Sequence, residues 1–203
     1  MKPQIGWQAV RILASIAALA VVASAAHAQT NVRVRGTIAA VDGNVLSVKS
    51  RDGRDLRIQL ADNVAVAVAK AIKFDDIKQG DYVGTTTNAA PDGTLVAVEV
   101  HYLAPTTPDG HTPWDLQAGS MMTNANVASI VQSTGKRELT LKYKDGSKTI
   151  VVPDGVPIVR AVPGARSDLV PGEYVFLVAQ GAPDGTLSAP RVQVSKDGVK
   201  PPQ

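Results

Sequence analysis

The sequence predicts an all-β protein made of two successive units of similar size. Three observations lead to this prediction: short segments in which apolar and polar residues alternate, turn residues between them, and an internal repeat. Alternating segments bounded by Gly, Pro, Asn and Asp are typical of β-strands joined by tight turns. With 17 Gly and 13 Pro among 203 residues, turn residues are spread along the whole chain.

The N-terminal segment has the features of a cleavable signal peptide. Lys2 and Arg11 flank an uncharged apolar run from Ile12 to Ala23. This run is shorter than the roughly 20 apolar residues of a membrane-spanning helix, but it fits the core of a signal peptide. The small residues Ala26 and Ala28 supply a cleavage motif. We therefore expect residues 1–28 to be removed and the protein to be periplasmic or secreted.

An internal repeat divides the remainder of the chain. Ala90–Leu95 returns letter for letter as Ala182–Leu187, at an offset of 92 residues. Two weaker matches keep the same order: 80–83 with 172–175, and 48–53 with 141–146. Such self-similarity indicates a tandem duplication. It predicts one unit at 32–103, a second at 126–197, and a short tail at 198–203.

Each unit reads as strands, tight turns and one helical turn. Two runs alternate clearly and place these residues inward: Leu56, Ile58, Leu60, Leu139, Leu141 and Tyr143. Asp52-Gly53 and Asp145-Gly146 are dipeptides favoured in hairpin turns. Segments 74–79 and 167–170 resemble single helical turns. Five or six strands in about 70 residues predict a small OB-like β-barrel in each unit, with a β-sandwich built jointly by both units as the alternative.

The segment between the units, 104–125, differs in composition from a flexible linker. It contains His111, Trp114, Asp115, Met121 and Met122, whereas flexible linkers are rich in Gly and Ser. Trp and Met side chains commonly fill irregular contacts between packed elements. We expect this segment either to fill the seam between the barrels or to line a ligand site formed by Trp114, Asp115 and His111.

Charge and cysteine content narrow the partner classes. The signal segment carries two of the 21 basic residues and none of the 18 acidic ones, so cleavage lowers the net charge from +3 to +1. So neutral a protein has no evident need of a polyanionic partner, and we expect no nucleic acid, because aromatic stacking platforms are scarce. The chain has no cysteine, which excludes disulfides and thiolate sites. We expect no transmembrane span after cleavage.

Two segments of the sequence resemble those of a known protein family. The segment Gly110–Ser120, the Met-Thr-Asn-Ala that follows it, and Leu139–Gly146 are similar to small exported proteobacterial proteins of unknown function with OB-like repeats. Some of those relatives carry the label of metal ABC transporter permease. A permease needs several apolar spans of about 20 residues, and this sequence contradicts the label because its one long apolar run is the signal segment.

A copper site is the alternative that the label and the residues suggest. Beyond the signal segment, His101 and His111 are the two imidazoles, and Met121 and Met122 could add soft thioether ligands, with Asp115 as a fifth. The alternation of its strand places His101 on the outward face beside Glu99, where an exposed histidine is expected. Apart from this copper, the sequence implies no cofactor.

Enzymatic motifs are absent from the sequence. It contains no nucleophile elbow, no zinc-protease motif, no P-loop and no dinucleotide fingerprint. Ser120, His111 and Asp115 are the one set that could be drawn as a triad, but such sets depend on geometry. An unknown hydrolase therefore remains only a second alternative. The leading hypothesis is a non-catalytic exported binding module, whose partner would be a glycan, lipid headgroup or protein of the envelope.

Overall fold

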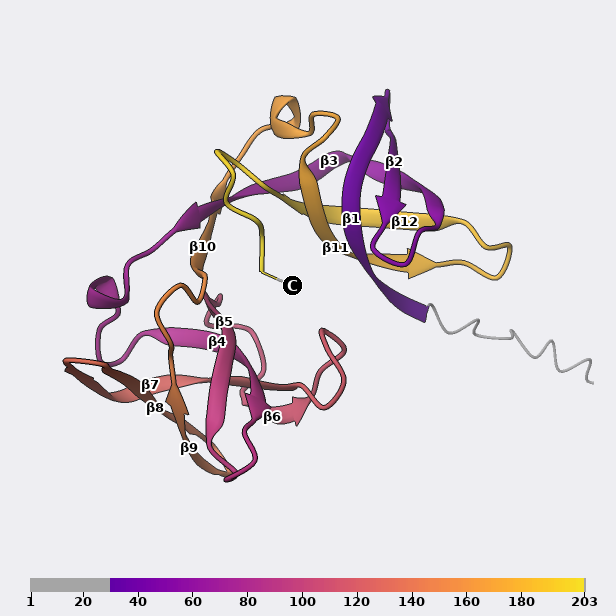
Figure 1. Ribbon diagram of the computed structural model, residues 1–203. Coiled ribbons are helices and arrows are strands. Elements are labelled where there is room, and N and C mark those ends of the chain that lie inside the picture. Colours follow the sequence, from indigo (N-terminus) through magenta and orange to yellow (C-terminus); the bar gives the residue numbers. More distant parts are fainter. Residues whose placement is uncertain (1–29, 203) are drawn as a thin grey trace, which may run out of the picture.

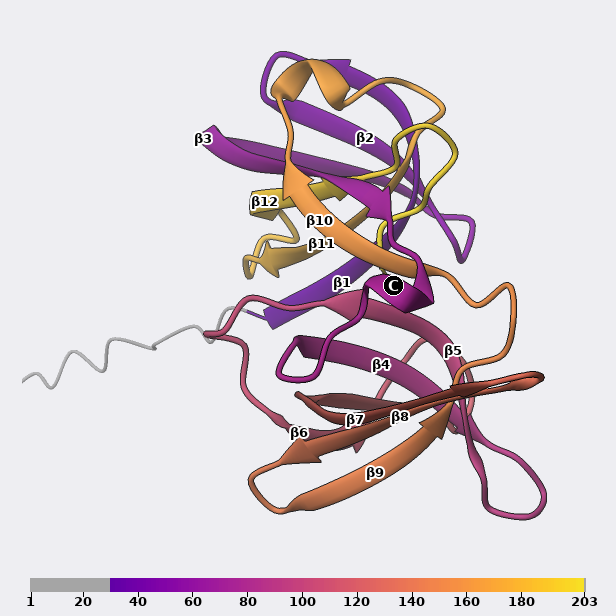
Figure 2. The same ribbon diagram turned by 90° about the vertical axis from the view of Figure 1, so that its left-hand side faces the viewer.

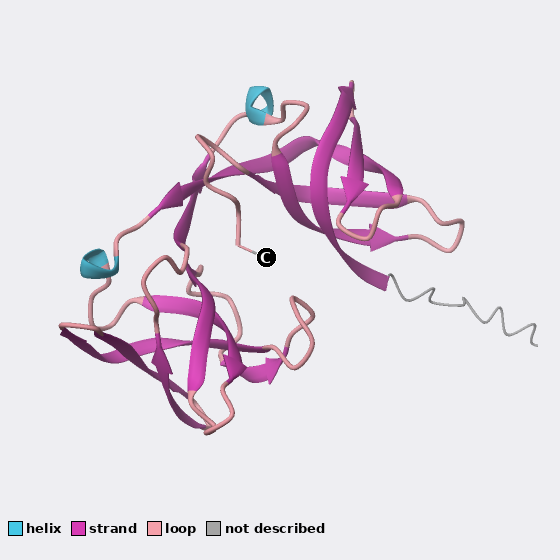
Figure 3. Cartoon of the chain, viewed as in Figure 1, coloured by secondary structure: helices cyan, strands magenta, loops and turns pink. Residues whose placement is uncertain are grey.

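The computed structural model describes residues 30–202 and confirms the all-β class (Figure 3). This part of the chain has twelve strands and two short 3₁₀ helices. It contains no helix that is long and apolar enough to cross a membrane. The signal segment, with its cleavage motif at Ala26 and Ala28, lies outside the described residues.

The strands form two five-stranded barrels (Figures 1 and 2). Barrel 1 consists of β1 (Thr30–Asp42), β2 (Val45–Ser50), β3 (Asp55–Ala71), β11 (Tyr174–Gly181) and β12 (Leu187–Val194). Its order is β12-β11-β1-β2-β3, and parallel pairing of β12 with β3 closes the ring. Each of its strands therefore has a partner on both sides, which removes the free edges of an open sheet.

Barrel 2 closes in the same way. It consists of β4 (Tyr82–Ala89), β5 (Leu95–Tyr102), β7 (Met121–Ser133), β8 (Lys136–Tyr143) and β9 (Gly146–Val151). Its order is β5-β4-β7-β8-β9, and parallel pairing of β5 with β9 closes the ring. The short β6 (Gly110–Pro113) pairs with β7 outside the ring.

The barrels do not follow the predicted boundaries at 32–103 and 126–197. Barrel 2 is one continuous stretch from Tyr82 to Val151, whereas barrel 1 takes three strands from before this stretch and two from after it. The segment 104–125 is therefore not a connector between barrels. It is a loop within barrel 2 that contains β6 and the start of β7, at Met121.

The chain passes from barrel 1 to barrel 2 along β3, which is a long strand. This strand has 17 residues, and its last five, Ala67–Ala71, pair antiparallel with Val159–Pro163 of β10 (Ile158–Pro163). The two strands form a ribbon between the barrels (Figure 2). A hairpin turn determines the pairing only of the two strands that it connects, and these are neighbours in the sequence. The alternation and turns therefore predicted the strands correctly but not which barrel each strand joins.

Each barrel has its own hydrophobic core. Ile58 and Leu60 are buried in barrel 1, Leu139 and Leu141 are buried in barrel 2, and Leu56 and Tyr143 pack against these cores. The predicted inward residues are thus confirmed. The two helical turns are also present, as η1 (Phe74–Asp76) and η2 (Arg166–Asp168). Phe74 adds to the core of barrel 2, and Leu169, just after η2, adds to that of barrel 1.

The repeated hexapeptides adopt the same turn. In each, the first Ala accepts a hydrogen bond from the Gly amide and donates one to the carbonyl of the Thr. The carboxylates of Asp92 and Asp184 each accept a hydrogen bond from the Thr amide two residues on, at 2.9 Å. Gly93 and Gly185 both have φ of 84°, a left-handed conformation that favours glycine. The repeated letters therefore encode the same local structure.

Candidate functional site in the cleft between the barrels

A cleft of about 680 Å³ lies between the two barrels. One wall comes from β11 and β12 of barrel 1 and carries Phe176, Val178, Arg191 and Gln193. The facing wall comes from β5 and β7 of barrel 2 and carries His101, Met122 and Asn124. Arg160 of β10, Tyr102 at the end of β5, and Trp114 also line the cleft. Sites of this kind, between two folded bodies, are common locations for ligands.

Equivalent positions of the two barrels face this cleft. On barrel 2, Gly84 of β4 lies between His101 and Asn124 in the strand register. On barrel 1, Phe176 of β11 lies between Gln193 and Arg35. Because successive residues of a strand point to opposite faces, these side chains leave each barrel on its outer surface. Each barrel thus contributes two polar residues that flank one central position.

The loop of barrel 2 is fastened to barrel 1 by an ion pair. The guanidinium of Arg35 donates two hydrogen bonds to the carboxylate of Asp115, at 2.8 and 3.2 Å. Arg33 adds a contact of 3.7 Å to the same carboxylate. The side chain of Arg35 is only 4% exposed, whereas that of Asp115 is 49% exposed. The hydrogen bonds from Arg35 lower the pKa of Asp115, and the charges of both arginines act in the same direction.

Trp114 connects this ion pair to the cleft. The guanidinium of Arg33 lies 4.2 Å from the centre of the Trp114 ring, and that of Arg35 lies 5.8 Å from it. Arg35 also lies 5.2 Å from the ring of Phe176. These distances are typical of cation–π contacts. Trp114 therefore contacts barrel 1 at the seam between the barrels and also lines the cleft.

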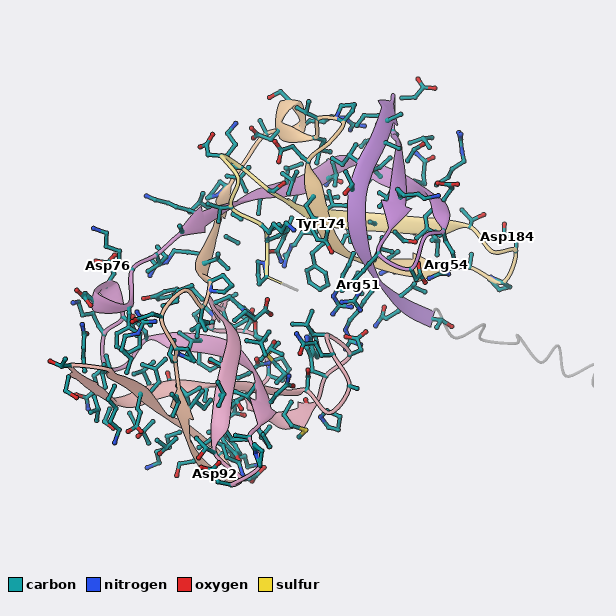
Figure 4. The ribbon with its side chains drawn as sticks, in the orientation of Figure 1. Arg51, Arg54, Asp76, Asp92, Tyr174 and Asp184 are labelled. Atoms are coloured by element: carbon teal, nitrogen blue, oxygen red, sulfur yellow. The ribbon has the colours of Figure 1, made fainter. Side chains whose placement is uncertain are left out.

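A second set of contacts holds the same loop. Arg51, after β2, donates to the main-chain carbonyls of Leu116 at 3.1 Å and Asp115 at 3.4 Å. Figure 4 labels Arg51 and Tyr174 on barrel 1. The Nζ of Lys200 lies 5.1 Å from the ring of Tyr174. The C-terminal tail thus returns to the space between the barrels (Figure 1), where Pro201 and Pro202 are buried and Pro202 lines the cleft.

His101 faces outward from its barrel as predicted, but the expectation that it is exposed is wrong. The residue lines the cleft but is only 8% exposed. Burial lowers its pKa to about 4, so the ring is neutral at pH 7. The 3.8 Å contact between its Nδ1 and Glu99 Oε1 is therefore not an ion pair at neutral pH. Glu99 instead accepts a hydrogen bond of 3.0 Å from Thr86.

Gly84 makes room for the imidazole. A Cβ atom at this position would lie 2.5 Å from His101 Nε2 and 3.0 Å from Asn124 Oδ1. Contacts this short do not occur without displacement of one partner. The absence of a side chain at Gly84 therefore lets His101 and Asn124 approach the same point on the outer surface of barrel 2.

Buried polar atoms without a partner gather at the cleft. In residues 30–202 they are Arg35 Nε, Thr85 Oγ1, His101 Nδ1, Asn124 Oδ1 and Gln193 Oε1. His101, Asn124 and Gln193 line the cleft, and Arg35 contacts Phe176 at its wall. We call Arg35, His101, Asn124 and Gln193 the polar quartet. Most buried polar atoms in proteins are hydrogen-bonded, so four exceptions close together make this cleft the candidate site.

The four residues considered as copper ligands are divided between two faces of barrel 2. His101 and Met122 lie on the outer face, at the cleft. His111 pairs with Thr123 across β6 and β7, and its Nδ1 is 2.8 Å from the Thr123 hydroxyl. Met121 shares this opposite face, because it is two residues from Thr123 along β7. The structure therefore does not bring the predicted set together, and residues 30–202 hold no group of three or more His, Cys, Asp or Glu suited to a metal.

The residues that could have formed a triad each have another partner. The Ser120 hydroxyl donates to Asn88 Oδ1 at 2.9 Å and accepts from the Gln117 amide. Asp115 is bound to Arg35, and His111 contacts Thr123 and stacks at 6.5 Å on Tyr143. Partial burial lowers the pKa of His111, with a smaller contribution from the charge of Lys148. Serine, histidine and aspartate are thus not assembled.

Comparison with known proteins does not place the chain in a family. No family model, curated protein or solved structure matches it.

Among the residues predicted from the sequence, His101, Trp114 and Met122 line the cleft, whereas Asp115 lies beside it on Arg35 and His111 lies at Thr123, away from it. The sequence did not reveal the other residues of the site, which are Arg35, Asn124, Arg160, Phe176, Arg191 and Gln193. One signal was available for two of them. Phe176 and Gln193 stand 92 residues after Gly84 and His101, the offset of the repeat. Comparing outward positions of the two units would have shown this match, but not that the two faces meet.

Proposed function

We propose that this protein is a non-catalytic, exported binding module whose ligand site is the cleft between the barrels. The observation that carries the proposal is the polar quartet, in which four buried polar atoms without partners gather beside aromatic and cationic side chains. An unsatisfied buried polar atom costs about 1–3 kcal/mol. A ligand that pairs these atoms would remove that cost.

Several further observations support the binding class. The cleft combines apolar surface from Phe176, Val178 and Met122 with a few polar groups, as small-molecule and oligomer sites do. Ser120, His111 and Asp115 are each engaged elsewhere, so the structure offers no reason to prefer a hydrolase. The signal-like segment supports an envelope location, and the resemblance to exported proteins agrees with it.

The repeat supports an origin by duplication. If both halves descend from one unit, that unit would have closed its barrel with a second copy of itself. Fusion of the two copies would then have placed two equivalent outer faces opposite each other. The cleft would be a product of this event, and its two walls could diverge, as Gly84 and Phe176 have done.

The experiment that tests the function is retention of an envelope component on the purified protein, with the signal segment removed. Val178→Asp places a charge in the cleft at an exposed position, so the fold should tolerate it. Val131→Asp is the matched control, because Val131 of β7 is similarly exposed, at 43% against 41%, and does not line the cleft. We expect Val178→Asp to abolish retention and Val131→Asp to preserve it.

Two results would contradict the proposal. The first is that no component is retained specifically by the unaltered protein from glycan, lipid and protein fractions. The second is that both aspartate variants retain the same component as the unaltered protein, because the cleft would then not be the site.

A further inference from the structure

The hydrogen-bonding character of the polar quartet restricts the ligand. Asn124 Oδ1 and Gln193 Oε1 are acceptors, whereas Arg35 Nε is a donor. The orientation of Asn124 is fixed, because its amide nitrogen already donates to the carbonyl of Pro108 at 3.1 Å. The neutral imidazole of His101 offers its unpartnered Nδ1 as donor or acceptor, according to tautomer. The ligand must therefore supply donors and acceptors to neighbouring points.

Hydroxyl groups meet this requirement, because each can donate one hydrogen bond and accept others. A purely anionic ligand would not satisfy the carbonyl oxygens of Asn124 and Gln193, because it has no hydrogen to donate. A ligand rich in hydroxyl groups can pair with all four members of the quartet.

The walls that the two barrels contribute to the cleft are faces of sheets and not edges. Extended peptides commonly bind by adding a strand to a free sheet edge. Parallel pairing of β12 with β3 and of β5 with β9 closes both barrels. The main chain of a peptide would thus find no strand edge to pair with in the barrel walls. This disfavours a peptide strand relative to a ligand recognised by its hydroxyl groups.

Two arginines add positive charge to the same cleft. Arg191 is exposed and, within residues 30–202, forms no ion pair. Arg160 is also exposed and lies 3.8 Å from the centre of the Tyr102 ring, again with no carboxylate partner in the described chain. Among residues 30–202, Asp81 is the one acidic residue of the lining, and it accepts a hydrogen bond from the Tyr102 hydroxyl at 2.8 Å. The planar guanidinium of arginine matches a carboxylate in geometry and charge.

From these observations, and resting on the proposed binding function, we propose that the cleft binds an oligosaccharide that carries carboxylate groups. Its hydroxyl groups pair with the polar quartet, its apolar ring faces lie against Phe176 and Trp114, and its carboxylates pair with Arg160 and Arg191. The quartet atoms are closed to solvent, so binding requires a small opening of the cleft.

The protein contains its own reporter for the test. The sequence has two tryptophans, Trp7 and Trp114. Trp7 lies in the signal segment, so Trp114 at the cleft is the only one after cleavage. The processed protein is titrated with a tetramer of a uronic acid and with the same tetramer after reduction of its carboxyl groups to alcohols. Trp114 emission and calorimetry give the two dissociation constants.

We expect the acidic tetramer to bind at least about tenfold more tightly than the reduced one, because hydrogen bonds to charged groups are the stronger ones. Arg191→Ala should reduce this preference, because Arg160 remains, and it should not affect the fold, because the side chain of Arg191 is exposed. Arg57→Ala is the matched control, since Arg57 is an exposed residue of barrel 1 that does not line the cleft. Gln193→Leu should weaken the binding of both tetramers.

The outcomes distinguish the inference from the proposed function. If neither tetramer binds while envelope retention persists and is lost in Val178→Asp, the carbohydrate class is wrong and the binding function stands. Displacement of the retained component by a peptide would likewise overturn the carbohydrate class. Equal binding of both tetramers, or an unchanged preference in Arg191→Ala, would overturn the role of the arginines. Absence of both retention and oligosaccharide binding would overturn both proposals.

Discussion

Replacing Asp115 with Ala is expected to lower the free energy of unfolding by about 2–3 kcal/mol. The change leaves the buried guanidinium of Arg35 without its carboxylate. Breaking a fully buried ion pair costs about 3–5 kcal/mol, whereas an exposed pair contributes about 0–1 kcal/mol. Arg35 is 4% exposed and Asp115 is 49% exposed, so the value should lie between these limits. For a protein of this size, the melting temperature should fall by about 4–12 °C.

The same pair should stabilise the protein only above a certain pH. The pKa of Asp115 in the folded protein is lowered, mainly by the hydrogen bonds from Arg35, relative to its value in the unfolded chain. Between the two pKa values the unfolded state binds more protons. The contribution of Asp115 is therefore fully present above its unfolded pKa of about 3.9, and it is lost as the pH falls through the folded value.

The measurement is urea unfolding followed by the emission of Trp114, which contacts Arg33 and Arg35 directly. Asp55→Ala is the control, because Asp55 pairs with Lys49 at 3.2 Å with both side chains largely exposed. We expect this control to change the free energy of unfolding by less than about 1 kcal/mol. If Asp115→Ala has no larger effect than Asp55→Ala, the ion pair does not fasten the loop to barrel 1.

Three further predictions concern the exchange of strands between the barrels, the cleavage of the signal segment and the pKa of His101. A fragment of residues 72–158 should fold alone, as circular dichroism and dispersed amide resonances would show, whereas 30–103 should not; a folded 30–103 fragment would contradict the strand exchange. N-terminal sequencing of the exported protein should find Gln29 first, and an intact N-terminus would argue for a retained anchor. His101→Gln should reduce the loss of stability between pH 6.5 and 4 by up to about 3 kcal/mol, because the unfolded histidine binds a proton there and the buried one does not. Identical pH profiles for this variant and the unaltered protein would disprove the low pKa of His101.

The sequence was sufficient to predict the strands and turns, but not how the strands assemble into barrels. Leu139 and Leu141 alternate with polar residues, and this alternation alone places them in a core. The repeated Pro-Asp-Gly turns were equally readable, because Gly93 and Gly185 need a left-handed backbone. Both signals act over a few residues. Closure of a barrel joins β12 to β3 across more than 100 residues of chain, and no local pattern records that pairing.

The residues of the candidate site could likewise be predicted only in part. Trp114 and Asp115 stand out in the sequence, because residues of these types are unusual in a linker. Their partners Arg33 and Arg35 resemble ordinary surface cations on an outward face. The outward orientation of His101 on β5 was also predicted correctly, but its burial was not. Residues at a surface between two bodies carry no pattern that distinguishes them from residues exposed to solvent.

The insertion of barrel 2 within barrel 1 has a consequence for the order of folding. Barrel 2 is continuous in sequence and can form as soon as residues up to Val151 are available. Barrel 1 cannot close until β11 and β12 arrive, so β1 and β3 keep open edges while the rest of the chain emerges. Open edges invite pairing between molecules. The window between formation of the two barrels is therefore when two chains could exchange their last strands, and rapid arrival of the C-terminal hairpin protects against this.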